Sequence, residues 1–444
     1  ELAQLHADYD TLTSVIVTPQ QIYNEFSSGA QDVTAIRDFV KMLYDRAATA
    51  EERPNYLLFI GDGSYDHKYR IPNNTNFIPT FQNLDGLGLT ASYVSDEFFG
   101  LLNDSGEWDS GNDIGVCDIG IGRFPVQSSN EAQEIVDKIR FYMTKQEPIV
   151  NAAACSDNQC GAGGEWRNTV VFIGDDDDSN IHMDQADDMA TLVDTTYDDY
   201  NIDKIYLDAY QQEQTPGGER YPTVNEAINR KVERGCLIMN YTGHGGEVGL
   251  AHERIMEVQQ INAWDNLCNM PLFVTATCEF ARYDDPGRTS AGEYVILNQN
   301  GGGIALFTTT RLVYSTPNFI LNRNFYRTVF EPINGEMPHI GDVYRITKAL
   351  SGNSINNRNF TLLGDPALKL NYPANQVITT EVNNQPINMS QADTLSALSR
   401  VTIKGFVADT AGNLMTGFNG ILYPTVFDKP STVTTLGNDP PNVP

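Results

Sequence analysis

The chain has 444 residues, of which 41% are hydrophobic and 20% are charged, a balance typical of a globular protein with buried cores. Its 58 acidic side chains against 29 basic ones give a formal charge of −29, which repels phosphate backbones and argues against nucleic acid as a partner. The sequence contains no run of about 18 apolar residues, so no membrane-spanning helix is predicted.

The first part of the chain, 1–150, has the pattern of an α/β unit. Thr18, Pro19 and Gln21 combine a helix cap, a proline at the first helical position and a capping box. A continuous apolar run at 56–60 predicts a strand buried on both faces. The other predicted elements are helices at 32–46 and 128–145 and a strand at 118–123.

The second part, 151–372, alternates strands with helices. The predicted strands are 170–173, 204–207, 236–241, 272–277 and 304–309, and the predicted helices are 183–193, 222–232, 290–298 and 318–330. This alternation predicts right-handed crossovers and an α/β fold whose mostly parallel sheet is covered on both sides. Ligands then bind beyond the carboxyl ends of the strands.

The remainder, 373–444, loses helical periodicity and predicts a small β-rich module, with a strand near 400–406 and a turn at 411–413. Six cysteines are too few for a disulfide scaffold. Cys155 and Cys160 share a Gly- and Asn-rich loop and could bridge each other. The other four lie in or near apolar runs, where a free cysteine behaves as a small hydrophobe.

The residues best suited to chemistry follow two predicted strands. His244 lies among glycines directly after the strand 236–241, and Cys278 ends the strand 272–277. If these strands are neighbours, the imidazole and the thiol emerge side by side, as a catalytic dyad requires. An imidazolium beside the sulfur would then lower the thiol pKa. The alternative is a purely structural role, in which the cysteine is buried in the core and the histidine only forms a turn.

Four consecutive carboxylates, Asp175, Asp176, Asp177 and Asp178, follow the strand 170–173. One of them could orient His244, while the others form a solvated loop or a calcium site. The surroundings of His244 and His252 have no recognised zinc spacing, which argues against a zinc centre. No Gly-x-Ser-x-Gly context supports a serine hydrolase.

Two motifs carry a resemblance to a known family: Asn240-Tyr241-Thr242-Gly243-His244-Gly245 and, 34 positions after the histidine, the cysteine of Ala276-Thr277-Cys278. Together with Ile121-Gly122-Arg123-Phe124 and Leu363-Gly364-Asp365-Pro366-Ala367-Leu368, they resemble the gingipain family of cysteine peptidases. The resemblance implies two caspase-like subdomains, 1–150 and 151–372, followed by an immunoglobulin-like module at 373–444. Within the family, the runs 20–29, 35–40, 61–66 and 95–100 are similar to sortases of the type IX secretion system.

Carried over residue by residue, the resemblance implies His244 as general base and Cys278 as nucleophile. The amides of Gly245 and Cys278 would donate to the oxyanion of the tetrahedral intermediate. The carboxylate beside the catalytic histidine falls closest to Asp176, with Asp175 as the other choice.

One position departs from the pattern of the arginine-specific gingipains. The aspartate that binds the basic side chain of their substrates falls at Asn180 in this sequence, and Asp178 and Asp184 are the nearest carboxylates. The departure argues against a preference for arginine.

The resemblance to the sortases implies a cysteine transpeptidase at the outer-membrane surface of a Gram-negative bacterium. It would cleave the C-terminal sorting domain from secreted cargo and pass the acyl group to an anionic lipopolysaccharide, working beside outer-membrane secretion-system proteins. No cofactor is required, and calcium would be a structural ion bound by a loop of Asp175, Asp177 and Asp178.

Two alternatives remain, a secreted gingipain-like endopeptidase that hydrolyses proteins and a catalytically inert binding module of the same fold. The family pattern also places a strand before the helix near Leu2, a long β region before that and a secretion module after the β module. We therefore expect a chain cut at both ends.

Overall fold

The computed structural model describes residues 1–86, 88–103, 116–144, 164–352, 354–387, 395–396, 398–420, 422 and 432–438. Their contacts form two compact units, one of Glu1–Asn371 with a terminal segment that begins at Val433, and one of Tyr372–Thr432. The division of the chain at 150 and 372 into three domains stays a prediction. Within the described ranges, no helix is both long and apolar enough to cross a membrane.

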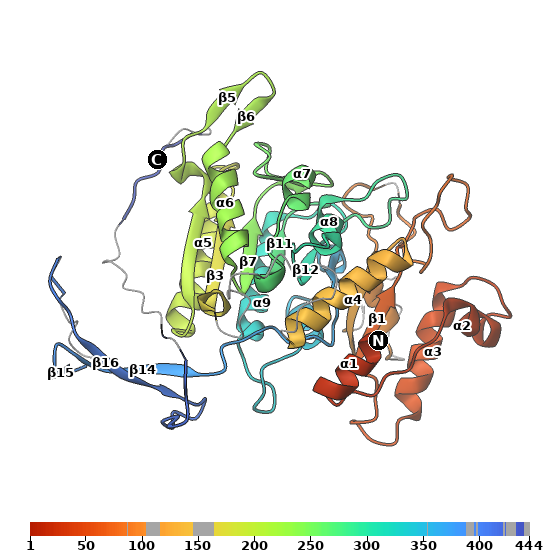
Figure 1. Cartoon of the computed structure of the whole chain (residues 1–444). Coiled ribbons are helices and arrows are strands. Elements are labelled where there is room, and N and C mark those ends of the chain that lie inside the picture. The colour runs from red at the N-terminus through yellow and green to blue at the C-terminus, as the bar shows by residue number, and fades with distance from the viewer. Residues whose placement is uncertain are drawn as a thin grey trace. The chain divides into compact units, whose positions relative to one another are not determined.

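The first unit is built on an eight-stranded sheet with the order β1-β2-β13-β12-β11-β7-β3-β4 (Figure 1). Its strands are β1 Tyr56–Ile60, β2 Gly120–Phe124, β3 Thr169–Gly174, β4 Asn201–Tyr206, β7 Ile238–Thr242, β11 Leu272–Ala276, β12 Ala305–Thr309 and β13 Phe360–Leu363. All neighbouring strands in this sheet are parallel except β12 and β13. The predicted α/β fold with a mostly parallel sheet is confirmed.

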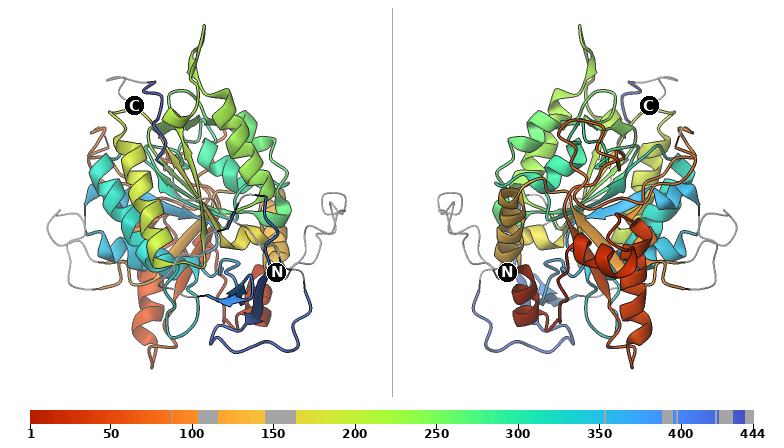
Figure 2. Two further views of the ribbon diagram at one scale, coloured as in Figure 1. Left: turned by 90° about the vertical axis from the view of Figure 1, so that its left-hand side faces the viewer. Right: turned by 90° about the vertical axis from the view of Figure 1, so that its right-hand side faces the viewer.

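Helices cover both faces of this sheet (Figure 2). The helices are α1 Leu2–Tyr9, α2 Pro19–Phe26, α3 Val33–Arg46, α4 Ser129–Thr144, α5 Ile181–Thr196, α6 Pro222–Arg234, α7 Val258–Asn262, α8 Ala291–Leu297, α9 Ser315–Val329, α10 Ile340–Leu350 and α11 Ile355–Arg358. α9 packs against α5 and α10, whereas α8 packs against α4 and α7. Every residue of β7, β11 and β12 is buried, as expected for strands covered on both sides. The prediction that 56–60 is buried on both faces is wrong, because β1 is an edge strand in which only Phe59 is buried and Ile60 is exposed.

Local sequence signals fix several helix starts. The hydroxyl of Thr18 accepts a hydrogen bond from Gln21 N–H, and the Gln21 side chain accepts one from Thr18 N–H, which is the predicted capping box. Asp32 caps α3 by accepting a hydrogen bond from Thr34 N–H, and Ser290 and Glu293 form a second capping box at α8. The pattern did not reveal β13 or α10, which had no predicted counterpart.

Arg123 ties the two predicted subdomains together. β2 pairs with β13 through Arg123 and Leu363. The Arg123 guanidinium is fully buried, binds Asp96 through two hydrogen bonds of 2.7 Å and lies over the rings of Phe59 and Tyr283. A fully buried guanidinium needs several acceptors in such an arrangement, and the carboxylate of Asp96 accepts from two of its nitrogens.

The second unit contains an antiparallel sheet with the order β15-β14-β16, formed by Gln385–Pro386, Gln376–Val382 and Ile403–Ala408. This sheet agrees with the predicted β-rich module.

The cysteines differ in part from expectation. Cys117, Cys236 and Cys278 are free, as expected, but Cys268 is disulfide-bonded and is not the free apolar residue that its context predicted. Cys155 and Cys160, whose pairing was considered, lie outside the described residues.

Candidate active site

Three neighbouring strands end together at one edge of the sheet. β7 lies between β3 and β11, and the register places the last residues of both neighbours opposite Thr242, the last residue of β7. His244 follows two residues after Thr242, and Cys278 follows two residues after the end of β11. Because neighbouring strands are only about 4.8 Å apart, the backbones of His244 and Cys278 leave the sheet side by side. The two strands are neighbours, which is the condition that a dyad of His244 and Cys278 requires.

The glycines around His244 are required by close backbone contacts. A Cβ on Gly243 would lie 2.2 Å from Cβ of Asp175 and 2.5 Å from the Tyr241 hydroxyl oxygen. A Cβ on Gly245 would lie 2.5 Å from Oγ1 of Thr277. Only glycine at these positions lets the histidine loop lie directly against the ends of β3 and β11.

His244 is fixed by contacts to its backbone and to its ring. Its N–H donates to Oδ2 of Asp175 over 2.7 Å, and its carbonyl accepts from the Tyr241 hydroxyl over 2.6 Å. Nε2 of its ring lies 3.0 Å from Oδ2 of Asp178. A proton on Nε2 would be stabilised by this carboxylate, which leaves the lone pair on Nδ1 available as a base.

The Cys278 thiol is half-buried and lies against Val313. Sγ is 3.5 Å from both the amide nitrogen and the carbonyl oxygen of Val313. Among the described contacts, no hydrogen bond joins Sγ to the His244 ring. Burial raises the pKa of the Cys278 thiol, and the Val313 N–H offsets only part of that effect. The sequence led us to expect a lowered pKa, which this conformation does not have, because His244 binds Asp178 and the sulfur binds Val313.

The four carboxylates after β3 have different surroundings. Asp175 and Asp176 are buried, and burial raises the pKa of Asp175 to about 6. The Tyr221 hydroxyl donates to Oδ2 of Asp176, whereas Asp178 contacts the His244 ring. The choice of Asp176 as the third catalytic residue stays a prediction, and the contact to the ring favours Asp178.

The two remaining positions considered for binding a basic substrate lie at the start of α5. Asn180 is the N-cap of α5, and Asp184 lies exposed in its first turn. Among the described hydrogen bonds and ion pairs, none joins Asn180 or Asp184 to His244 or Cys278.

The family model for peptidase family C25 matches residues 1–371. The chain is a cysteine peptidase of family C25, the gingipain family. No curated protein matches the sequence.

Solved gingipain structures share this fold. The chain superposes on the Arg-specific cysteine proteinase gingipain R (RgpB) with a TM-score of 0.60 and 18% identity, over 85% of this chain and 78% of that one. The complex of Porphyromonas gingivalis RgpB pro- and mature domains gives the same values. Dimeric latent PorU from Porphyromonas gingivalis is similar with a TM-score of 0.44 and 23% identity, over 93% of this chain and 32% of that one.

The peptidase has a cluster of oxygen ligands behind the histidine loop. Carboxylate oxygens of Asp175, Asp177 and Glu253 lie within 4.8 Å of one another. Asp175 and Glu253 are buried, and Oδ1 of Asp175 has no hydrogen-bond partner in the described part of the chain. Three carboxylates suit a hard cation. The calcium loop stays a prediction, with Glu253 in the place that we expected for Asp178.

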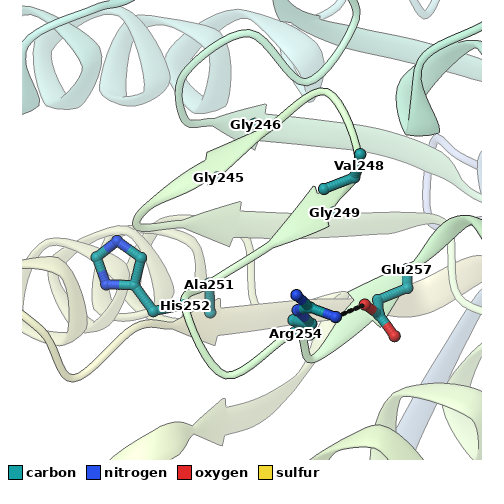
Figure 3. A pocket seen from close by; sticks show the side chains of 8 residues that line it. All are labelled: Gly245, Gly246, Val248, Gly249, Ala251, His252, Arg254 and Glu257. Atoms are coloured by element: carbon teal, nitrogen blue, oxygen red, sulfur yellow. Dashed lines mark ion pairs between the residues drawn. The ribbon is translucent and has the colours of Figure 1, made fainter. Parts of the chain in front are cut away.

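A pocket of about 230 Å³ opens beside the histidine loop of the peptidase (Figure 3). It is formed by the hairpin of β8 (Gly245–Gly246) and β9 (Gly249–Leu250), which follows His244. A Cβ on Gly246 would meet nothing within 4 Å, so the backbone is accessible there. The ring of His252 lines the pocket and stacks on the His244 ring with centroids 5.0 Å apart. An extended peptide could therefore approach His244 along this glycine-rich hairpin.

Proposed function

We propose that this peptidase is a transpeptidase in which Cys278 is the nucleophile and His244 is the general base. The observation that carries the proposal is the position of both residues at the ends of adjacent parallel strands. We further propose that its substrates are secreted proteins with C-terminal sorting domains and that the acceptor is an amine on an anionic lipopolysaccharide. The similarity of residues 20–29 and 95–100 to type IX secretion sortases supports this reaction and a site at the outer-membrane surface.

The reaction begins with proton transfer from the thiol. Because burial raises the pKa of Cys278, the thiol needs a base to become nucleophilic. Nδ1 of His244 takes the proton while Asp178 keeps the other proton on Nε2. This assigns the orienting role to Asp178 instead of Asp176. The side chain of Cys278 must leave Val313 and turn towards the imidazole for the transfer to occur.

The thiolate then attacks the carbonyl carbon ahead of the sorting domain and forms an S–C bond. The amides of Gly245 and Cys278 are proposed to stabilise the oxyanion, since Gly245 packs against the residue before Cys278. The C–N bond breaks as the leaving amine takes the proton from His244. The acceptor amine attacks the resulting thioester, forms a C–N bond and loses a proton to His244. The C–S bond then breaks, and His244 returns the proton to the sulfur, which leaves an amide product and a free thiol.

The experiment compares two products of one reaction. Cargo that carries its C-terminal sorting domain is incubated with the enzyme, with and without an amine acceptor, and the new terminus is identified by mass spectrometry. We expect an amide-linked product that disappears in Cys278→Ala and persists in the matched variant Cys236→Ala, because Cys236 is free but fully buried. Hydrolysed product alone would favour the endopeptidase. Cleavage that survives Cys278→Ala would refute the proposal.

The alternative that the chain is a catalytically inert binding module is tested with the same protein. A thiol-directed acyloxymethyl ketone that fails to modify Cys278 would favour binding without catalysis. Rapid cleavage of small arginine substrates would contradict the inference drawn from Asn180.

A further inference from the structure

Three side chains of the kind that bind transition metals converge beside the proposed catalytic dyad. Oδ2 of Asp178 lies 3.0 Å from Nε2 of His244 and 3.5 Å from Nε2 of His182. One ligand atom from each residue lies within 4.8 Å of the other two. None of these contacts belongs to the carboxylate cluster of Asp175, Asp177 and Glu253.

The separations match the ligand shell of a small ion. A tetrahedral zinc ion lies about 2.0–2.1 Å from nitrogen and oxygen ligands, which places neighbouring ligand atoms about 3.3 Å apart. The two distances from Asp178 fall on either side of that value. The third separation, between the two imidazoles, is at most 4.8 Å, so an ion would draw the rings of His182 and His244 closer together.

His182 supports a metal site independently, because hydrogen bonds within the described part of the chain do not account for its buried ring. His182 is 6% exposed, and within the described part of the chain neither ring nitrogen has a hydrogen bond of normal geometry; Oδ2 of Asp178, 3.5 Å from Nε2, makes only a long ion pair. Buried polar groups nearly always have a hydrogen-bond partner. The ring meets that of His244 edge-on, with centroids 5.2 Å apart. A buried imidazole with unused nitrogens beside a carboxylate and a second imidazole points to a metal ligand.

The backbone that presents Asp178 is held in an unusual conformation. Asp178, Ser179 and Asn180 have φ values of 55°, 60° and 65°, so three successive residues other than glycine are left-handed. Each such residue costs about 1–2 kcal/mol. The turn connects the end of β3 to α5 and places Asp178 between His182 and His244.

We propose that Asp178, His182 and His244 form a site for a zinc-class ion that switches the peptidase off. Two imidazoles and one carboxylate suit zinc, whereas calcium requires oxygen ligands. The net charge of −29 and the nearby carboxylates attract cations to this edge. Sequence spacing did not reveal the site because Asp178 and His244 are 66 positions apart and meet only through β3 and β7.

The inhibition follows from the two nitrogens of one ring, and it rests on the proposed role of His244 as base. A metal ion on Nε2 displaces the proton that Asp178 would otherwise stabilise there. That proton then resides on Nδ1, the nitrogen that must accept the proton of Cys278. The ion also takes the carboxylate of Asp178. The metal-bound enzyme therefore keeps its thiol protonated and is inactive.

The test measures zinc binding and cleavage separately. Chain freed of metal by a chelator is titrated with Zn²⁺ in competition with a chromophoric chelator, and Co²⁺ is used to record the visible spectrum of a tetrahedral site. We expect one ion for each chain. His182→Gln should weaken zinc binding by about 100-fold or more, since losing even an outer partner of a ligand costs about 10- to 100-fold. The matched variant His252→Gln should bind like the unaltered chain, because His252 is exposed and outside the cluster.

Cleavage is recorded for each variant relative to its own rate without zinc, and inhibition should follow the affinity measured by competition. Equal zinc affinity in His182→Gln and the unaltered chain would overturn the proposal. Loss of binding in Cys278→Ala with retention in His182→Gln would place the ion on the thiol and overturn it as well. A chain that binds zinc through His182 but cleaves nothing without zinc would refute the proposed function and leave the metal site standing.

Discussion

The contacts of His6 predict how the stability of the first unit changes with pH. Nε2 of His6 lies 2.7 Å from Oδ2 of Asp365, and Nδ1 lies 2.7 Å from Oδ2 of Asp10. Burial by itself lowers the pKa of His6, but the two carboxylates outweigh it and raise the pKa from 6.5 to about 9. Since the folded pKa is the higher one, charged His6 stabilises the fold fully below pH 6.5. That contribution is lost as the pH rises from 6.5 through 9.

The magnitude follows from the size of the shift. The difference between a pKa of 6.5 and one of about 9 corresponds to about 3.4 kcal/mol, and solvent screening at the partly exposed partner Asp10 reduces it to about 2 kcal/mol. Urea unfolding at pH 6 and pH 9 should show this loss of unfolding free energy in the unaltered chain. His6→Gln should lack it, because all other titrating groups are shared. The same pH dependence in both proteins would refute the reasoning.

Three further predictions concern the histidine loop, the buried arginine and the carboxylate cluster. Gly243→Ala should reduce kcat/KM about 100-fold or more, because the added Cβ would displace Asp175 and with it His244. An unchanged kcat/KM would contradict the close packing of the histidine loop. Arg123→Ala should lower the unfolding free energy in urea by about 3–5 kcal/mol, because it leaves the buried carboxylate of Asp96 without its partner. The double variant Arg123→Ala/Asp96→Ala should recover part of that loss. An Arg123→Ala variant as stable as the unaltered chain would contradict a stabilising role for this ion pair. Calcium at about 100 times its Kd should stabilise the chain by about 2.7 kcal/mol in calorimetry, and Glu253→Gln should remove the effect; equal stabilisation of both would exclude Glu253 as a ligand.

Much of the sheet could be predicted because its strands are continuous apolar runs between turn residues. Such runs at β3, β11 and β12 reveal buried strands directly. The run at β1 reveals the strand but not its exposure, because β1 lies at the edge of the sheet and only Phe59 in it is buried. β13 has only four residues, and its pairing with β12 depends on contacts about 50 positions away along the chain. The antiparallel pairing of β12 with β13, which joins the two halves of the sheet, could therefore not be predicted from the local sequence.

The residues of the site likewise fall into those that the sequence could predict and those that it could not. His244 and Cys278 could be found because each directly follows a recognisable strand. The contact of Asp178 depends on three successive left-handed residues that are not glycine. Asp and Asn adopt this conformation more often than most residue types, but their presence does not predict three such residues in a row. Glu253 joins the carboxylates only because the β8–β9 hairpin returns the chain beside β3. His182 lies before the helix that periodicity predicted to begin at 183.

The central claim is that His244 activates Cys278, and covalent labelling tests it most directly. A peptidyl acyloxymethyl ketone is added at neutral pH, and the labelled residue and the rate are determined by mass spectrometry. We predict that Cys278 alone is labelled among the free cysteines Cys117, Cys236 and Cys278. The rate should fall about 100-fold or more in His244→Ala, the smallest typical contribution of a general base. Labelling of Cys278 at an unchanged rate in a folded His244→Ala variant would contradict the account.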